Sequence, residues 1–248
     1  MQRLNMKTTD RRVFEHDLFP QIELDSFYEG GKRYYKTPDG QMYPSVTSVL
    51  SFFKDDAIDK WRARVGEQEA NRISKYASDR GTALHTMCEN YLANDEHYKK
   101  KAMPSTLQLF KGIQHIIDRD VEVVHGIEIP LFSHKLKTAG RCDLFCRYQG
   151  LYTIADFKTS TRDKKESWIK NYYLQATTYA IMVEEMYKEY FSTPIHIPQL
   201  AVIIAVEDGE EPAQLFVKQT KDYREEAIEM FANYHNQHQM LTIDQFIV

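Results

Sequence analysis

The chain has 248 residues, of which 42% are apolar, and its formal net charge is −4 at pH 7. This length and composition suffice for one full hydrophobic core and argue against two equal, independent domains. The summed charge excludes long-range attraction of a polyanion by the molecule as a whole, so any nucleic-acid surface must be a local basic patch.

The three cysteines, Cys88, Cys142 and Cys146, offer no disulfide framework, and their odd number favours a reducing compartment and buried thiols. A cysteine-ligated iron–sulfur cluster needs four ligands, and the spacing is not that of a zinc site, so we expect neither. We find no apolar signal region and no stretch of eighteen apolar residues. We therefore expect a cytoplasmic protein without signal peptide or membrane span, from a bacterial or phage-infected cell.

Residues 1–40 are predicted to form an N-terminal arm and a small hairpin. The first 30 residues show no sustained period, which predicts an irregular or extended lead-in. Gly30-Gly31 and Pro38-Asp39-Gly40 are turn signals on either side of a short aromatic run, and Pro44-Ser45 then predicts a helix start.

Residues 41–120 are predicted to form a helical lobe. Apolar residues recur at helical spacing from Ser45 to about Asn94, with interruptions predicted near Gly66 and Gly81. A further helix is predicted after Pro104, because the apolar residues that follow it fall on one helical face.

Residues 121–248 change to a strand-like period and are predicted to form the core of one compact domain. The order of elements predicts an α/β or α+β fold with a central mixed sheet flanked by helices. The predicted strands are 121–132, 138–148, 151–159, 199–207 and an edge strand 214–219, and the predicted helices are 166–190 and 222–240.

The most informative segment lies in two neighbouring predicted strands. Asp143 is in the first, and Asp156 and Lys158 are two positions apart in the second, so their side chains share one face while Phe157 points into the core. The Gln149-Gly150 turn brings Asp143 alongside this pair.

Two carboxylates held together repel each other unless a cation lies between them, and hard oxygen ligands favour Mg²⁺ or Mn²⁺. A lysine beside such a metal could hold or deprotonate the attacking water, or offset charge on a phosphate, which suits phosphodiester hydrolysis. The alternative is that Asp143 and Asp156 cap turns and Lys158 is a surface residue, because an Asp-x-Lys triplet alone is a weak motif.

Taken together, the motifs resemble those of the RecB-like exonuclease branch of the PD-(D/E)XK nuclease superfamily. They are Gly140–Asp143, Asp156–Ser160, Gly81–His85, and Gln175 with Tyr179. Tyr43–Leu50 with Trp61 is similar to the mitochondrial genome maintenance exonuclease family and its phage-encoded relatives. The resemblance covers about residues 40 to 235 and implies a restriction-endonuclease-like core beside the helical lobe.

This resemblance also implies roles for individual residues. Asp143, Asp156 and His85 would bind metal, and Glu128 would be a further ligand or a group beside the ligands. Lys158 would assist the water, and Gln175 and Tyr179 would complete the catalytic set by orienting the lysine and a phosphate. The structural alternatives are a buried histidine, a cross-strand glutamate, a capping glutamine and a tyrosine that only packs.

Basic residues near these motifs are candidates for DNA contact, because phosphates must be neutralised locally, and an aromatic side chain can stack on a base. Solvated loops that happen to be basic are the alternative. The candidates are Lys135, Lys137, Arg162, Lys164, Lys165 and Tyr172.

The motifs together favour a Mg²⁺- or Mn²⁺-dependent exonuclease that hydrolyses single-stranded DNA from its ends in replication, recombination or repair. One alternative is an endonuclease that cuts flaps or junctions. A second alternative, from another class of protein, is a catalytically inactive nucleic-acid-binding module. The presence of Asp143, Asp156 and Lys158 counts against it, because inactive copies usually lose one of these residues. Replication or recombination proteins could act with the chain in trans.

Overall fold

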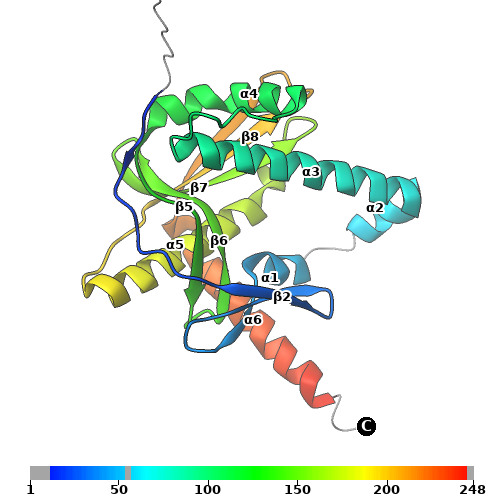
Figure 1. The fold of residues 1–248 in the computed structure, drawn as a ribbon. Coiled ribbons are helices and arrows are strands. Elements are labelled where there is room, and N and C mark those ends of the chain that lie inside the picture. The colour runs from blue at the N-terminus through cyan, green and yellow to red at the C-terminus, as the bar shows by residue number, and fades with distance from the viewer. Residues whose placement is uncertain (1–11, 54–56, 245–248) are drawn as a thin grey trace, which may run out of the picture.

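A mixed β-sheet runs through the middle of the molecule and carries helices on both faces (Figure 1). The computed structural model describes residues 12–53 and 57–244, and in this part the strand order of the sheet is β1-β5-β6-β7-β8-β9. Strands β5, β6 and β7 form an antiparallel meander, β8 lies parallel to β7, and β9 closes the edge antiparallel to β8. The predicted mixed sheet is confirmed. Its strands are β1 (Glu15–His16), β5 (Val121–Ser133), β6 (Thr138–Tyr148), β7 (Leu151–Ser160), β8 (Gln199–Val206) and β9 (Ala213–Gln219).

The two faces of the sheet carry separate hydrophobic cores. One core packs the sheet against α3 (Glu67–Leu92) and α4 (Pro104–Asp120). The other packs it against α1 (Val46–Phe52), α5 (Lys170–Phe191) and α6 (Lys221–Asp244). Strand β8 is buried along almost its whole length, as its continuous apolar run predicts for a strand covered on both faces.

Turn chemistry sets the register of the meander. Gln149 and Gly150 join β6 to β7, and both have positive φ, which a two-residue hairpin of this kind requires. Pro104 begins α4, and Ser45 caps α1 by accepting a hydrogen bond from the Ser48 backbone N–H at 3.0 Å. These helix starts are confirmed.

The helical segment before β5 differs from its prediction at one glycine. Gly66, with φ of +87°, separates α2 (Ala57–Val65) from α3, but α3 runs through Gly81 without a break. An interior glycine weakens a helix by only about 1 kcal/mol, and the turns that follow Gly81, from Leu84 to Leu92, are anchored in the core. The predicted interruption near Gly81 is therefore wrong.

The N-terminal segment contains more regular structure than its sequence predicts. β1 adds a short parallel edge strand to β5, and β2 (Asp25–Glu29), β3 (Lys32–Lys36) and β4 (Met42–Pro44) form a separate antiparallel sheet. Of the two predicted forms of this segment, extended and irregular, β1 and β2 have the extended one. Their pairing was not predicted, since strands this short or this exposed have no detectable period. Residues 1–11 of the predicted arm lie outside the described residues.

The long helix predicted from residue 166 begins instead with a 3₁₀ turn, η1 (Glu166–Trp168), and becomes α-helical at Lys170. All three cysteines are buried, unpaired thiols, as predicted. Within residues 12–53 and 57–244, we find no helix that combines the length and the apolar character needed to cross a bilayer.

Candidate active site

The site forms where β6 and β7 separate. Their last paired residues are Leu144 and Ala155, so Asp143 and Asp156 lie one position further along. There the Phe157 backbone N–H donates to Asp143 Oδ2 at 2.9 Å. The Asp143 side chain thus takes the place of the next backbone hydrogen bond between the two strands. Strand β7 remains paired with β8 as far as Ser160, so the opening lies only on its β6 side.

Glu128 lies across from Asp143 on β5. The flanking pairs Ile127–Leu144 and Ile129–Cys142 put the two acidic residues opposite each other, where cross-strand side chains are neighbours. Glu128 has a φ of +48°, a conformation that is strained for a residue with a side chain and is found preferentially at functional sites. The surrounding structure therefore holds this carboxylate in an unfavourable backbone position.

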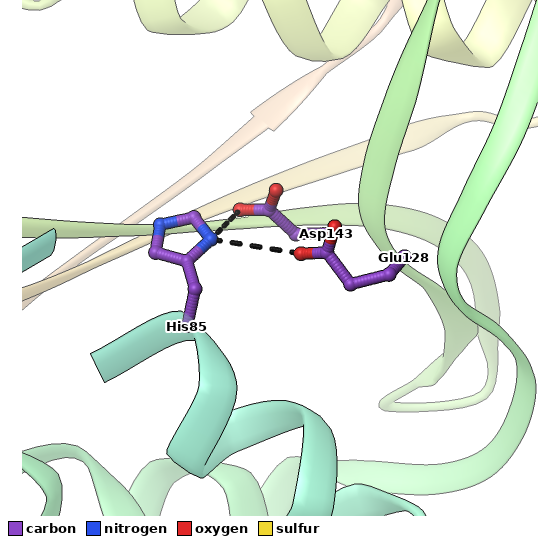
Figure 2. Close-up of side chains that lie close together, drawn as sticks. All are labelled: His85, Glu128 and Asp143. Carbon is purple, nitrogen blue, oxygen red and sulfur yellow. Dashed lines mark ion pairs between the residues drawn. The ribbon is translucent and has the colours of Figure 1, made fainter. Parts of the chain in front are cut away.

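His85 reaches the two carboxylates from α3 (Figure 2). Its Nδ1 lies 3.5 Å from Asp143 Oδ2 and 3.7 Å from Glu128 Oε1. One ligand atom from each of the three residues lies within 4.8 Å of the other two. Burial alone would lower the pKa of His85, but Glu128 and Asp143 outweigh it and the pKa is raised. Imidazole nitrogen and carboxylate oxygens in this arrangement are suitable ligands for a divalent cation.

Asp156 lies beside this three-residue cluster but outside it, and its carboxylate is 2% exposed. Asp156 Oδ2 lies 2.5 Å from Lys158 Nζ, yet neither carboxylate oxygen accepts a hydrogen bond of good geometry within the described part of the chain. Burial raises the pKa of Asp156 to about 6 in spite of Lys158. The Lys158 ammonium offsets part of the cost of burying this carboxylate, and a divalent cation beside it would offset more.

Lys158 is held as an ammonium ion. Burial alone would lower its pKa, but Asp156 and Asp143 outweigh burial and the pKa is raised. Its Nζ also lies 5.3 Å from the ring centroid of Tyr172, which is consistent with a cation–π contact. Tyr172 is thus placed against the candidate catalytic lysine.

Gln175 and Tyr179 lie one turn apart on α5, on the side that faces the sheet. Tyr179 is buried, and a Cβ added to Gly140 would lie 2.9 Å from its hydroxyl, so only glycine fits at that position of β6. Burial, followed by the charge of Asp143, raises the pKa of Tyr179 well above its usual value, so the phenol stays neutral. Gln175 is half-buried, and among the described residues its side chain has no hydrogen-bond partner.

The candidate DNA-contact residues fall into two places. Arg162, Lys164 and Lys165 follow β7 directly, at the end of the strand that carries Asp156 and Lys158. Lys135 and Lys137 lie in the β5–β6 turn, where the Lys135 backbone N–H donates to Glu185 of α5. Lys137 lies six positions before Asp143, or about 20 Å along the strand, so the structure does not bring this turn to the site.

Sequence reasoning missed two arginines near the site. Arg141 is two positions before Asp143 on β6, and its Nη1 donates to the Glu128 carbonyl oxygen at 3.3 Å. Arg33 of β3 lies 5.3 Å from the ring centroid of Tyr35. The spacing of two between Arg141 and Asp143 was a usable signal, whereas the approach of Arg33 depends on the packing of β3 against β6.

Comparisons with known proteins agree with the class of protein that the motifs predict. No family model matches the chain. Mitochondrial genome maintenance exonuclease 1 of Mus musculus is 28% identical over 151 residues, which cover 55% of this chain and 43% of that protein. Mitochondrial genome maintenance exonuclease 1 of Xenopus tropicalis is 24% identical over 133 residues, which cover 49% of this chain and 37% of that protein. This weak homology supports an exonuclease-like nuclease family for the chain.

The matched segment spans less than half the length of these relatives. Among solved structures, a "Putative exonuclease" from Eubacterium rectale matches with a TM-score of 0.41 and 15% identity, over 68% of this chain and 69% of that one. A likeness this distant adds nothing to the argument from the site.

Proposed function

We propose that this chain is a divalent-metal-dependent exonuclease that hydrolyses phosphodiester bonds in single-stranded DNA from a free end. The observation that carries the proposal is the convergence of His85, Glu128 and Asp143 beside the buried Asp156–Lys158 pair. The weak homology to exonucleases supports the same class of reaction.

The residues present fit a hard divalent cation. Three carboxylates and one imidazole surround the opening between β6 and β7. The buried Asp156 oxygens have the Lys158 ammonium beside them but accept no hydrogen bond of good geometry within the described part of the chain. His85, Glu128, Asp143 and Asp156 would hold the ion, with Mg²⁺ or Mn²⁺ favoured by the oxygen ligands. When bound, such an ion supplies positive charge that polarises a phosphodiester.

The chain's own residues then have separate tasks. Lys158, as an ammonium ion, would donate a hydrogen bond to the attacking water or to a phosphate oxygen, where charge develops. The Gln175 amide, which has no hydrogen-bond partner among the described residues, would orient the same phosphate. Tyr179 would position the site by packing against Gly140, because its neutral buried phenol is not poised to transfer a proton.

Incubation of the purified protein with end-labelled linear and with circular single-stranded DNA tests the proposal. Each substrate is incubated with Mg²⁺, with Mn²⁺ and with EDTA. Metal-dependent loss of the linear strand alone is the expected result, and Asp156→Asn should abolish it while the exposed control Lys100→Met should not.

Cutting of the circular strand would overturn the requirement for an end and assign an endonuclease that acts on flaps or junctions. Absence of cleavage with either metal, together with retained DNA binding, would assign a nucleic-acid-binding module without catalysis.

A further inference from the structure

A groove of about 440 Å³ lies between the β2–β3 hairpin and α1. Three kinds of side chain line it: cations, hydroxyls and aromatic rings. Four other cavities in the described part of the chain each have at least one carboxylate in their lining, whereas this groove has none. Its lining residues are Tyr28, Gly31, Lys32, Arg33, Thr47, Ser48, Ser51 and Phe52.

Arg33 is the cation of this groove that is available to a ligand. Its Nη2 lies 3.5 Å from Thr47 Oγ1, and we find no carboxylate within ion-pair distance of it among the described residues. A guanidinium has a planar fork of donors that matches a phosphate. Lys32 differs, because its Nζ already lies 3.0 Å from His238 Nε2 and 5.5 Å from the centre of the Phe52 ring.

Arg141 adds a second positive charge on β6, the strand that carries Asp143 and that contacts β3, the strand of Arg33. It is exposed, it makes no ion pair within the described part of the chain, and it lies on the same strand as Asp143. Both arginines act on Tyr35. Burial raises the pKa of this tyrosine, and the charges of Arg33 and Arg141 oppose that rise without cancelling it. The Arg33 guanidinium lies 5.3 Å from the centre of the buried Tyr35 ring, and the charge of Arg141 reaches the same ring.

We propose that Arg141, Arg33 and the hydroxyl-lined groove bind the phosphates of the single-stranded DNA segment adjoining the scissile bond. This inference rests on the proposed function and assigns it a substrate-binding track outside the metal site. Phosphates are attracted by cations that have no competing carboxylate, and the hydroxyls of Thr47 and Ser51 add uncharged donors. Tyr28 is 74% exposed at the rim and offers a ring face to an unpaired base, which a duplex does not present.

Binding in EDTA tests this track without requiring cleavage. The affinity for a fluorescein-labelled oligothymidylate is measured by anisotropy over a series of salt concentrations, for wild type, Arg33→Gln, Arg141→Gln and Arg147→Gln. Arg147 is the matched control, because it lies on the same strand as Arg141 but at the opposite end, beside the Gly150 turn.

Arg33→Gln and Arg141→Gln should each weaken binding about tenfold. Each should also reduce the slope of log affinity against log salt by about 0.7, the value for one phosphate contact on a single strand. Arg147→Gln should bind like wild type. Wild-type affinity and slope in both Arg33→Gln and Arg141→Gln would overturn the proposal.

Thr47→Glu provides a second test that does not depend on losing a side chain. Thr47 lies exposed in the first turn of α1, where an acidic side chain is favourable for the helix, so weaker binding could not be assigned to unfolding. The new carboxylate would pair with Arg33 and repel phosphate, whereas Thr47→Gln adds similar bulk without charge. The proposal requires weak binding by the first variant and near-normal binding by the second.

These measurements separate the two proposals. Loss of binding in the arginine variants of a protein that cleaves nothing would refute the nuclease function and leave the binding track supported. Normal binding in those variants of a protein that cleaves linear strands would refute the track and leave the nuclease function supported.

Discussion

Lys158 and Asp156 form an ion pair, but replacing one or the other should have different effects on cleavage and on metal binding. Lys158→Met removes the ammonium that would act on water or phosphate, and cleavage should fall by about a thousandfold or more. The ligands stay in place, so a metal-dependent rise in Tm should persist in this variant. Asp156→Asn should lose cleavage and also most of this Tm response, because it removes a ligand. Single-turnover rates and thermal melts with and without Mn²⁺ measure both effects, and full activity in either variant would show that the site lies elsewhere.

Gly140 is constrained by the close approach of Tyr179 to β6. In Gly140→Ala the new methyl group would lie 2.9 Å from the Tyr179 hydroxyl and ring edge, both in the core. We expect a loss of about 1 to 3 kcal/mol in the free energy of unfolding, as for other overpacked sites. Urea unfolding measures it, and the added change Tyr179→Leu should recover part of the loss. An unchanged stability in Gly140→Ala alone would refute the steric account.

Parts of the site were predictable from single residues and parts were not. The shared face of Asp156 and Lys158 follows from their spacing of two, and the approach of Asp143 follows from the Gln149-Gly150 turn. The strained backbone of Glu128 and the approach of Arg33 were not predictable, because both are set by contacts between distant segments. The position of His85 was inferred from family resemblance, since helical period alone does not say what a helix packs against.

At the level of elements, the junction of α4 with the β6–β7 hairpin depends on one buried carboxylate. Asp120 accepts two bonds from Arg119, one from the Tyr148 hydroxyl at 2.6 Å and one from the Gln149 amide at 3.1 Å. Arg119 first, then Tyr148 and Gln149, lower the pKa of Asp120 to about 2 against the opposing effect of burial. Because the folded pKa lies below the unfolded one, this contribution to stability is present above about pH 4 and is lost as the pH falls toward 2.

Tyr148→Phe tests this junction. Removal of the hydroxyl should reduce the free energy of unfolding by about 1 to 2 kcal/mol at pH 7, because a buried carboxylate loses a donor. The difference from wild type should shrink as the pH falls below 4, and urea unfolding across that range measures it. Tyr152→Phe is the control, since Tyr152 is only partly buried and its hydroxyl has no hydrogen bond among the described residues. A difference independent of pH would indicate lost packing instead of lost charge stabilisation.

The elements themselves were largely predictable because their periods are strong and their boundaries carry turn or capping residues. Pro104, Ser45 and Gln149-Gly150 each end or begin an element where predicted. The prediction failed at Gly81, because a single glycine costs only about 1 kcal/mol and the turns that follow it, from Leu84 to Leu92, pack against the sheet. It also missed the pairing of β1, whose two residues pair with β5 through backbone contacts that leave no pattern in the sequence.

At the scale of the whole molecule, the candidate metal ligands come from two layers, the helix α3 and the sheet that it covers. His85 is on α3, which packs on one face of the sheet, while Glu128 and Asp143 lie on the strands β5 and β6. A cation held by all three would link the helical layer to the sheet, and binding to the folded state alone raises stability by mass action. The site would therefore stabilise the arrangement of the layers as well as supply charge for hydrolysis.

Metal removal should accordingly destabilise the entire chain. At a Mn²⁺ concentration about one hundred times its Kd, binding adds about 2.7 kcal/mol. For a chain of this size, that corresponds to a rise in Tm of about 5 to 10 °C relative to EDTA. His85→Ala should remain folded in EDTA and lose most of this rise, whereas the exposed control His97→Ala should keep it. Differential scanning calorimetry measures the six Tm values, for wild type and the two variants with Mn²⁺ and with EDTA. An undiminished rise in His85→Ala would mean that the ion is held by the sheet residues without α3.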